Sequence, residues 1–284
     1  MPQQPTLEPP LYHYTDINGL IGILGSKCLR ASDARFLNDA QELTFGGDLA
    51  NELLQEKIVA LRADPSGRAG DWNNLEIAAM LEACIHQLES FTVNSTPFVA
   101  CLSDAHNRLS QWRGYGDQGY AIGFDRATLN KYVTSTPTVS SVRRPRLAKV
   151  EYGRENHTIA AAVEQALVDA IDHGPSGHPG SSSYFRVERL IADALPLAKD
   201  PAFFEEQEWR ISIPEPADRK FRPSALGPIP YTEVKFGDDA VREIVIGPGR
   251  DQDVRRAAVT TFISHQFDDP WNVKIYDSGI PFRN

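Results

Sequence analysis

The chain has few cysteines and no long apolar run. Cys28, Cys84 and Cys101 lie far apart in 284 residues and form no CxxC pair, which argues against a disulfide framework or a zinc site. We interpret all three as small buried hydrophobic side chains. No stretch approaches the roughly 18 apolar residues that a membrane span needs, and the N-terminus lacks the features of a signal peptide. We therefore expect a soluble, cytoplasmic protein with no membrane partner.

The sequence also lacks a surplus of basic residues. It has 29 Lys and Arg against 38 Asp and Glu, a net charge of −9, which disfavours nonspecific binding to nucleic acid. One local exception is the basic block over 143–149, with Arg143, Arg144, Arg146 and Lys149. The hydrophobic share of 41% and the charged share of 24% are close to globular averages, so the chain can bury a sizeable core.

Apolar spacing predicts an α+β protein. We expect a flexible lead-in over 1–10 and a single domain over 11–284, because the Gly/Pro/Ser segment 173–183 is typical of a loop. The predicted helices cover 16–26, 38–54, 75–91, 157–171, 184–197 and 251–265. The predicted strands cover 11–15, 29–32, 98–103, 120–124, 149–152, 208–213, 241–247 and 273–276. Few strands alternate strictly with helices, which favours α+β over a doubly wound sheet.

The first group of residues that indicates chemistry lies in the opening strand, which reads Leu-Tyr-His-Tyr-Thr. Alternation puts Tyr12 and Tyr14 on one face, and His13 with Leu11 and Thr15 on the other. The strand runs into a helix, whose first N–H groups can bind an anion, so His13 could hold a hydroxyl or a phosphate. The alternative is that His13 hydrogen-bonds a carbonyl in the core.

The second group lies between two apolar strands. Ser103 and Asp104 are followed by Ser-Gln-Trp-Arg-Gly-Tyr-Gly-Asp over 110–117. Glycines let the backbone approach a ligand closely, and the rings of Trp112 and Tyr115 offer stacking surfaces. The alternative is a tight connection in which Trp112 covers the core.

The third group is Phe-Phe-Glu-Glu-Gln-Glu-Trp-Arg over 203–210. Glu206 and Glu208 would share a face if a strand begins there, so the proton affinity of one carboxylate would be raised. Such a group suits acid–base catalysis or the stabilisation of a developing cation. The alternative is a solvated strand entry with Glu208 paired to an arginine.

Taken in order, these motifs resemble a bacterial family known as domain of unknown function 2971. The resemblance covers roughly Leu11 to Pro248 and is carried by YHYT, SxxLxASDxRFLND, SxxxxRLSQWRGYGDxGxAIGF, FxEExEWR and EIVIGP. The family itself implies no chemistry. Arg35, Asn38, Asp39 and Glu42 are typical of it, and Arg35 could bind a pyrophosphate through its fork of donors or pair with Glu42.

The opening strand and helix also resemble the start of ADP-ribosyltransferase-type domains, including DarT-like DNA-modifying toxins. In that superfamily a first-strand His or Arg contacts the NAD ribose, a mid-sheet strand carries a Ser or Tyr, and a late strand opens with the catalytic Glu. His13, Ser103 and Glu208, with Glu206 two positions earlier, match these features in order. The second motif departs from the Ser-Thr-Ser signature of the arginine-modifying class. The resemblance implies a split mixed sheet flanked by helices.

The resemblance further implies NAD as the substrate. Glu208 or Glu206 would stabilise the oxocarbenium-like ribose or act as base, His13 would position the ribose, and Tyr14 or Trp112 would stack on a base. The residues assigned to NAD binding are His13, Tyr14, Thr15, Arg35, Ser103, Trp112 and Tyr115.

The leading hypothesis is therefore an ADP-ribosyltransferase or NAD glycohydrolase. Its acceptor would be a protein, or a nucleic acid reached through the basic block, and a toxin or phage-defence role follows by analogy alone. One alternative is a nucleotide-binding sensor or interaction module without catalysis. Another is a metal-dependent nuclease that uses Asp104, Asp117 and the glutamates, because carboxylates coordinate Mg²⁺, although no recognised metal-ligand spacing is present.

Overall fold

The computed structural model describes residues 8–36, 42–94, 96–116, 119–139, 143–175 and 182–281. They form a mixed sheet of ten strands, two small two-stranded sheets and a set of helices. The helices are α1 (Ile17–Ser26), α2 (Glu42–Ala63), α3 (Asn74–Asn94), α4 (Leu109–Gln111), α5 (Arg126–Thr134), α6 (His157–His173), α7 (Ser182–Ala192) and α8 (Gln252–Gln266). The α+β class is confirmed.

The main sheet follows the order β11-β12-β2-β5-β1-β6-β13-β14, with β10 and β7 joined through β5. Its strands are β1 (Leu11–Thr15), β2 (Cys28–Asp33), β5 (Phe98–Ser103), β6 (Tyr120–Phe124), β7 (Arg146–Lys149), β10 (Glu208–Ile213), β11 (Lys220–Arg222), β12 (Ile229–Lys235), β13 (Val241–Ile246) and β14 (Lys274–Asp277). The small sheets pair β3 (Arg68–Ala69) with β4 (Trp72–Asn73), and β8 (Glu151–Tyr152) with β9 (Ala198–Lys199).

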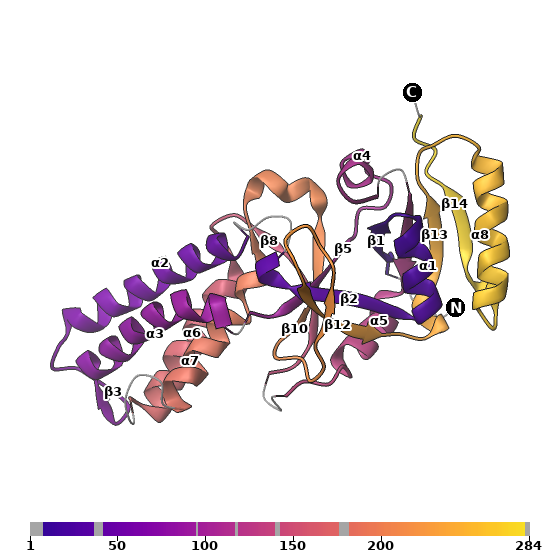
Figure 1. Cartoon of the computed structure of the whole chain (residues 1–284). Helices are drawn as coiled ribbons and strands as arrows, with labels where there is room; N and C mark the ends of the chain where they lie inside the picture. The colour runs from indigo at the N-terminus through magenta and orange to yellow at the C-terminus, as the bar shows by residue number, and fades with distance from the viewer. Residues whose placement is uncertain are drawn as a thin grey trace, which may run out of the picture.

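Two large hydrophobic clusters organise the molecule. One lies among α2, α3, α6 and α7, which form the helical end in Figure 1. Their buried residues recur at helical spacing, as Leu54 and Ile58 do in α2 and Ile77 and Leu81 do in α3. The other lies between the main sheet and α1, α5 and α8. The short helix η3 (Leu195–Leu197) and strand β9 carry the chain from the helical end back to the sheet.

Helix α2 continues through two glycines because one of them is needed for packing. A Cβ atom on Gly46 would lie 2.6 Å from the Leu195 carbonyl oxygen, so only glycine lets α2 approach η3 this closely. A Cβ on Gly47 would meet nothing within 4 Å. The close approach therefore depends on one glycine of the pair.

Strand β5 is where the sheet divides. One edge of β5 pairs along its whole length with β10, from Glu208 opposite Ser103 to Ile213 opposite Phe98. The other edge is shared, because β2 pairs with its beginning and β1 pairs with its end. Strand β1 meets β5 only where Tyr12 is opposite Ser103, whereas it pairs with β6 along all of its residues. Strands β1 and β5 therefore diverge.

The start of the chain shows how sequence leads to this arrangement. Asp16 caps α1, because its side chain accepts a hydrogen bond of 2.7 Å from the Gly19 N–H. Leu20 and Leu24, four residues apart, are buried against the sheet. In β1, Leu11 belongs to the main sheet cluster, while Tyr12 and Tyr14 pack on the opposite face. The predicted alternation in this strand is confirmed.

Candidate functional site

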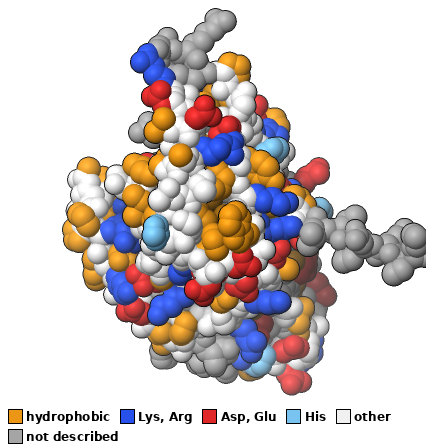
Figure 2. Space-filling model, turned by 90° about the vertical axis from the view of Figure 1, so that its right-hand side faces the viewer, with side chains coloured by type: hydrophobic (Ala, Val, Ile, Leu, Met, Phe, Trp, Pro, Cys, Tyr) orange, Lys and Arg blue, Asp and Glu red, His pale blue; other side chains and the backbone are white. Residues whose placement is uncertain are grey.

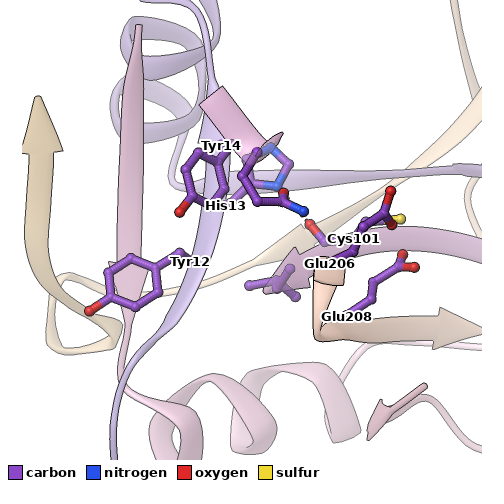
Figure 3. A pocket seen from close by; sticks show the side chains of 8 residues that line it. Tyr12, His13, Tyr14, Cys101, Glu206 and Glu208 are labelled. Carbon is purple, nitrogen blue, oxygen red and sulfur yellow. Dashed lines mark hydrogen bonds between the residues drawn. The ribbon is translucent and has the colours of Figure 1, made fainter. Parts of the chain in front are cut away.

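A small cavity of about 70 Å³ opens where β1 diverges from β5. It has room for about five to seven water-sized groups, which is enough for one end of a ligand but not for a whole dinucleotide. The residues that line it are Tyr12, His13, Tyr14, Cys101, Leu102, Gln111, Glu206 and Glu208. Figure 3 shows that Tyr12 points away from the two glutamates, and its hydroxyl donates to Glu243 Oε1 at 2.6 Å.

His13 connects the diverging strands through its side chain. The Nδ1–H group donates to the Cys101 carbonyl oxygen at 2.9 Å, where β1 and β5 no longer pair through their backbones. Burial lowers the pKa of His13 below its usual value. The ring is therefore neutral near pH 7, and Nε2 is a hydrogen-bond acceptor. The alternative of a bond to a core carbonyl is correct, and the same ring also lines the cavity.

Glu208 opens β10 inside a buried cluster of charges. It accepts hydrogen bonds of 2.8 Å from both Nε and Nη2 of Arg210, and one of 3.0 Å from Lys199 Nζ. Glu208, Arg210 and Lys199 are at most 4% exposed. Burial alone would raise the pKa of Glu208, but the charges of Arg210 and Lys199 outweigh it and lower the pKa to about 2. The carboxylate therefore stays ionised at physiological pH.

The expectation that the proton affinity of one of the two carboxylates is raised does not hold for Glu208, whose pKa is lowered. Glu206 ends the short helix η4 (Pro201–Glu206), and Gln207, in a left-handed conformation with φ of 43°, separates it from β10. Lys199 Nζ lies 2.6 Å from Glu206 Oε2 and 3.0 Å from Glu208 Oε2. The cation between the two carboxylates offsets their repulsion. Lys199 lies in β9. In the sequence, the only indication of its role is a positive charge that follows an apolar run.

Ser103 supports the cavity from outside. Its hydroxyl donates to the Glu206 carbonyl oxygen at 2.6 Å and accepts from the Ala105 N–H at 3.1 Å. It therefore joins the end of β5 to the end of η4. Among the described residues Ser103 is not one of those that line the cavity. Its predicted contact with NAD stays a prediction, and in the sheet Ser103 lies opposite Tyr12 and Glu208.

The aromatic residues of the second motif behave differently from the expectation. Trp112 is only 2% exposed and packs edge-on against Tyr14, with ring centroids 4.8 Å apart. Its Nε1–H donates to Asn107 Oδ1 at 3.1 Å. The assignment of Trp112 as a stacking surface is therefore wrong, and the alternative, that it covers the core, is correct. Tyr14 also has both hydrogen-bonding capacities used, by Ala105 O and the Asn107 N–H.

Arg35 lies at the other end of β5. It donates from Nε and Nη2 to Asp33 at 3.0 and 2.6 Å, and Asp33 is opposite Phe98, where β5 begins. The cavity lies toward the end of β5, and Arg35 is not among the described residues that line it; its assignment to NAD binding stays a prediction. The bond to Asp33, two residues earlier, is local and fits the fork of the guanidinium.

The remaining assigned residues complete this account. Thr15 packs against Gly19 at the start of α1, since a Cβ on Gly19 would lie 1.7 Å from Thr15 Oγ1. It is not among the described residues that line the cavity. Asn38, Asp39 and Asp117 lie outside the described residues, as do the side chains of Glu42 and Tyr115.

Sequence reasoning assigned no role to four residues that line the cavity, namely Tyr12, Cys101, Leu102 and Gln111. Cys101, which we interpreted as a core side chain, is partly exposed and lines the cavity, and its thiol donates to Glu208. Gln111 ends α4 and is 5% exposed. Its side-chain amide makes no hydrogen bond to any residue that the structure describes. In the sequence, the only indication of a role for Gln111 is its position next to Trp112.

The basic block is only partly at the surface. Arg143 is 5% exposed and donates to Asp193 at 2.9 Å and to Glu215 Oε1 at 3.0 Å. Lys149 is exposed and lies 3.2 Å from Asp104. On the face of the molecule that contains α8, basic and acidic side chains are interspersed (Figure 2). Arg143 therefore contributes little to any surface through which the block could contact a nucleic acid.

Two further searches were confined to the described residues. They contain no group of three His, Cys, Asp or Glu side chains that could hold a metal ion, so the metal-dependent alternative gains no support. None of their helices combines the length and the apolar character needed to cross a membrane.

The site is thus a small polar cavity between diverging strands of an α+β fold. Residues 111–211 match the model of a family described as protein of unknown function (DUF2971). Over this segment the match agrees with the resemblance that the motifs indicated. The matched segment begins at Gln111 and includes Glu206 and Glu208. No match to a curated protein or to a solved structure was found.

Proposed function

We propose that this cavity binds the nicotinamide end of NAD and that the chain cleaves the bond between nicotinamide and ribose. ADP-ribose would pass to a protein, a nucleic acid or water. The observation that carries the proposal is the convergence of a neutral imidazole from β1 and an ionised carboxylate from β10 on one cavity. The order of these residues along the chain is the order in ADP-ribosyltransferase-type domains.

The chemistry needs negative charge beside the ribose and an acceptor for a proton. When the C1′–N bond breaks, its electron pair leaves with neutral nicotinamide and the ribose becomes a cation. Glu206 and Glu208 supply negative charge beside that position, in surroundings from which most water is excluded. The incoming hydroxyl or water forms a bond to C1′ and loses a proton, which Nε2 of the neutral His13 can accept.

The pairing of Glu208 gives it a positioning role. Arg210 and Lys199 together compensate its charge and fix its orientation. Lys199 in turn holds Glu206 at 2.6 Å. Glu206 is the more accessible carboxylate of the two, so we assign it the contact with the ribose.

A second candidate is a nucleotide-binding module without turnover. The same buried ion pairs favour it, because a carboxylate whose hydrogen bonds are all satisfied within the protein needs no substrate. A toxin or phage-defence role belongs only to the first candidate.

The test is the release of nicotinamide from NAD by the purified full chain, with and without added DNA, RNA and cell lysate. Glu206→Gln should lower the rate about 100-fold or more. Glu205→Gln is the matched control, since Glu205 is its exposed neighbour outside the cavity. His13→Asn keeps a donor near the Nδ1 position for Cys101 O but removes Nε2, so it should also lower the rate about 100-fold.

The outcomes separate the two candidates. Release that Glu206→Gln abolishes and Glu205→Gln preserves would establish NAD cleavage. NAD binding without release under any of these conditions would favour the binding module. Equal activity of the parent and His13→Asn would refute the role of His13 as proton acceptor.

A further inference from the structure

Gln111 is a buried polar side chain whose function the fold does not explain. It is 5% exposed, it lines the cavity between β1 and β5, and within the described part of the chain its amide has no hydrogen-bond partner. No amide atom of Gln111 is among the fully buried side-chain atoms that lack a partner in the described residues, so the amide is open to the cavity. It is therefore available for a hydrogen bond to a group that enters the cavity.

The cavity offers two complementary hydrogen-bonding groups. The Gln111 amide carries one acceptor oxygen and two N–H donors. His13 Nε2 is an acceptor, because Nδ1–H is bonded to Cys101 O and burial keeps the ring neutral. A ligand must therefore present N–H groups to two acceptors and an oxygen to one donor. Glu206 and Glu208 also line the cavity, but Lys199 and Arg210 compensate their charges, so hydrogen bonding rather than net charge selects the ligand.

We propose that Gln111 determines specificity by pairing with the primary carboxamide of a small planar ligand. The Gln111 oxygen accepts one N–H of the ligand, the Gln111 N–H donates to the ligand oxygen, and His13 Nε2 accepts the second N–H. A carboxylate in the same place has no N–H for either acceptor. The cavity therefore distinguishes an amide from the corresponding acid.

This inference rests on the proposed function in one respect, that the carboxamide is the one in nicotinamide. It can be tested without any turnover. The affinities of nicotinamide, benzamide and nicotinate for the full chain are measured at pH 7 by calorimetry or by NMR titration. Nicotinamide and benzamide should bind at least about 100-fold more tightly than nicotinate, because a site built around N–H donors strongly rejects an analogue that lacks them.

Gln111→Leu removes the amide and keeps a side chain of similar size. It should weaken nicotinamide binding about 10-fold or more, as expected for two lost hydrogen bonds, and reduce the preference for nicotinamide over nicotinate. Gln55→Leu makes the same chemical change on the exposed surface of α2 and should leave both affinities unchanged. Gln111→Met replaces Gln111→Leu if the leucine variant does not fold.

Each result decides the inference separately from the proposed reaction. Equal affinities for nicotinamide and nicotinate, or a preference that Gln111→Leu preserves, would overturn it. Binding of adenine but not of nicotinamide would also overturn it. Nicotinamide binding that depends on Gln111, in a chain that does not cleave NAD, would support the inference and refute the reaction. NAD cleavage without a preference for the amide over the acid would support the reaction and refute the inference.

Discussion

Glu208→Gln removes the negative charge at the centre of a buried cluster and leaves two cations behind. Arg210 and Lys199 are at most 2% exposed and both donate to Glu208. A glutamine oxygen can accept one of these hydrogen bonds, but it cannot compensate either charge. Breaking a buried ion pair by removing one partner typically costs about 3–5 kcal/mol.

The pKa of Glu208 gives an independent magnitude for the same change. The pKa falls from 4.5 to about 2 in the folded chain, and a tenfold change in proton affinity corresponds to about 1.4 kcal/mol. The carboxylate therefore contributes about 3 kcal/mol to stability at neutral pH. This contribution is present above pH 4.5 and is lost as the pH falls toward 2, because the unfolded chain takes up the proton first.

The assay is equilibrium unfolding in urea at pH 7. Glu208→Gln should lower the free energy of unfolding by about 3 kcal/mol or more, and Glu205→Gln, in an exposed position, should change it little. The double variant Glu208→Gln/Arg210→Met removes both charges and should be more stable than Glu208→Gln alone. A loss below about 1 kcal/mol for Glu208→Gln would refute the cluster as a stabilising feature.

Three further predictions concern stability elsewhere in the chain. Burial raises the pKa of Glu188 to about 7, although Arg189 and Arg143 oppose the rise, so the contribution of Glu188 to the free energy of unfolding falls as the pH rises from 4.5 to 7. Glu188→Gln should therefore stabilise the chain at pH 8 by up to about 3 kcal/mol and have little effect at pH 5. Equal effects on unfolding in urea at both pH values would contradict this. Gly46→Ala should destabilise the chain by about 1 kcal/mol or more, because the alanine Cβ would lie 2.6 Å from Leu195 O. Gly47→Ala places its Cβ in open space and should stabilise the chain by up to about 1 kcal/mol. The reverse order of melting temperatures would exclude the close approach of α2 to η3. Gln111→Leu should change the melting temperature little, since among the described residues no amide atom of Gln111 is both fully buried and without a partner, and a clearly lower value would mean that the amide is already bonded.

Local patterns predicted the strands better than the partners of their side chains. The bounds of β5, β6 and β10 agree with the sequence prediction, because these are short apolar runs between clear turn signals. The sequence prediction missed α5, β11 and β12. Strand β11 has only three residues and Pro230 interrupts β12, so neither gives a clear alternation over several residues.

The candidate site was predicted in part. His13 and Glu208 line one cavity as expected, since each opens or occupies a strand that the pattern located. Lys199 could not be foreseen as their neighbour, because its place depends on how β9 returns from the helical end. Trp112 was placed in the site because aromatic rings and glycines suggest a ligand, but burial in a local cluster with Tyr14 and Val245 outweighed that pattern.

The divergence of β1 from β5 has a consequence for how relatives can vary. Alternate residues of β1 serve two surfaces, since Tyr12 and Tyr14 pack in one cluster while His13 bonds across to Cys101. Replacing one residue alters one surface, but inserting or deleting one residue exchanges both at once. We therefore expect homologues to differ in the chemistry of this strand while keeping its length, and to accept changes of length only in the loops beyond it.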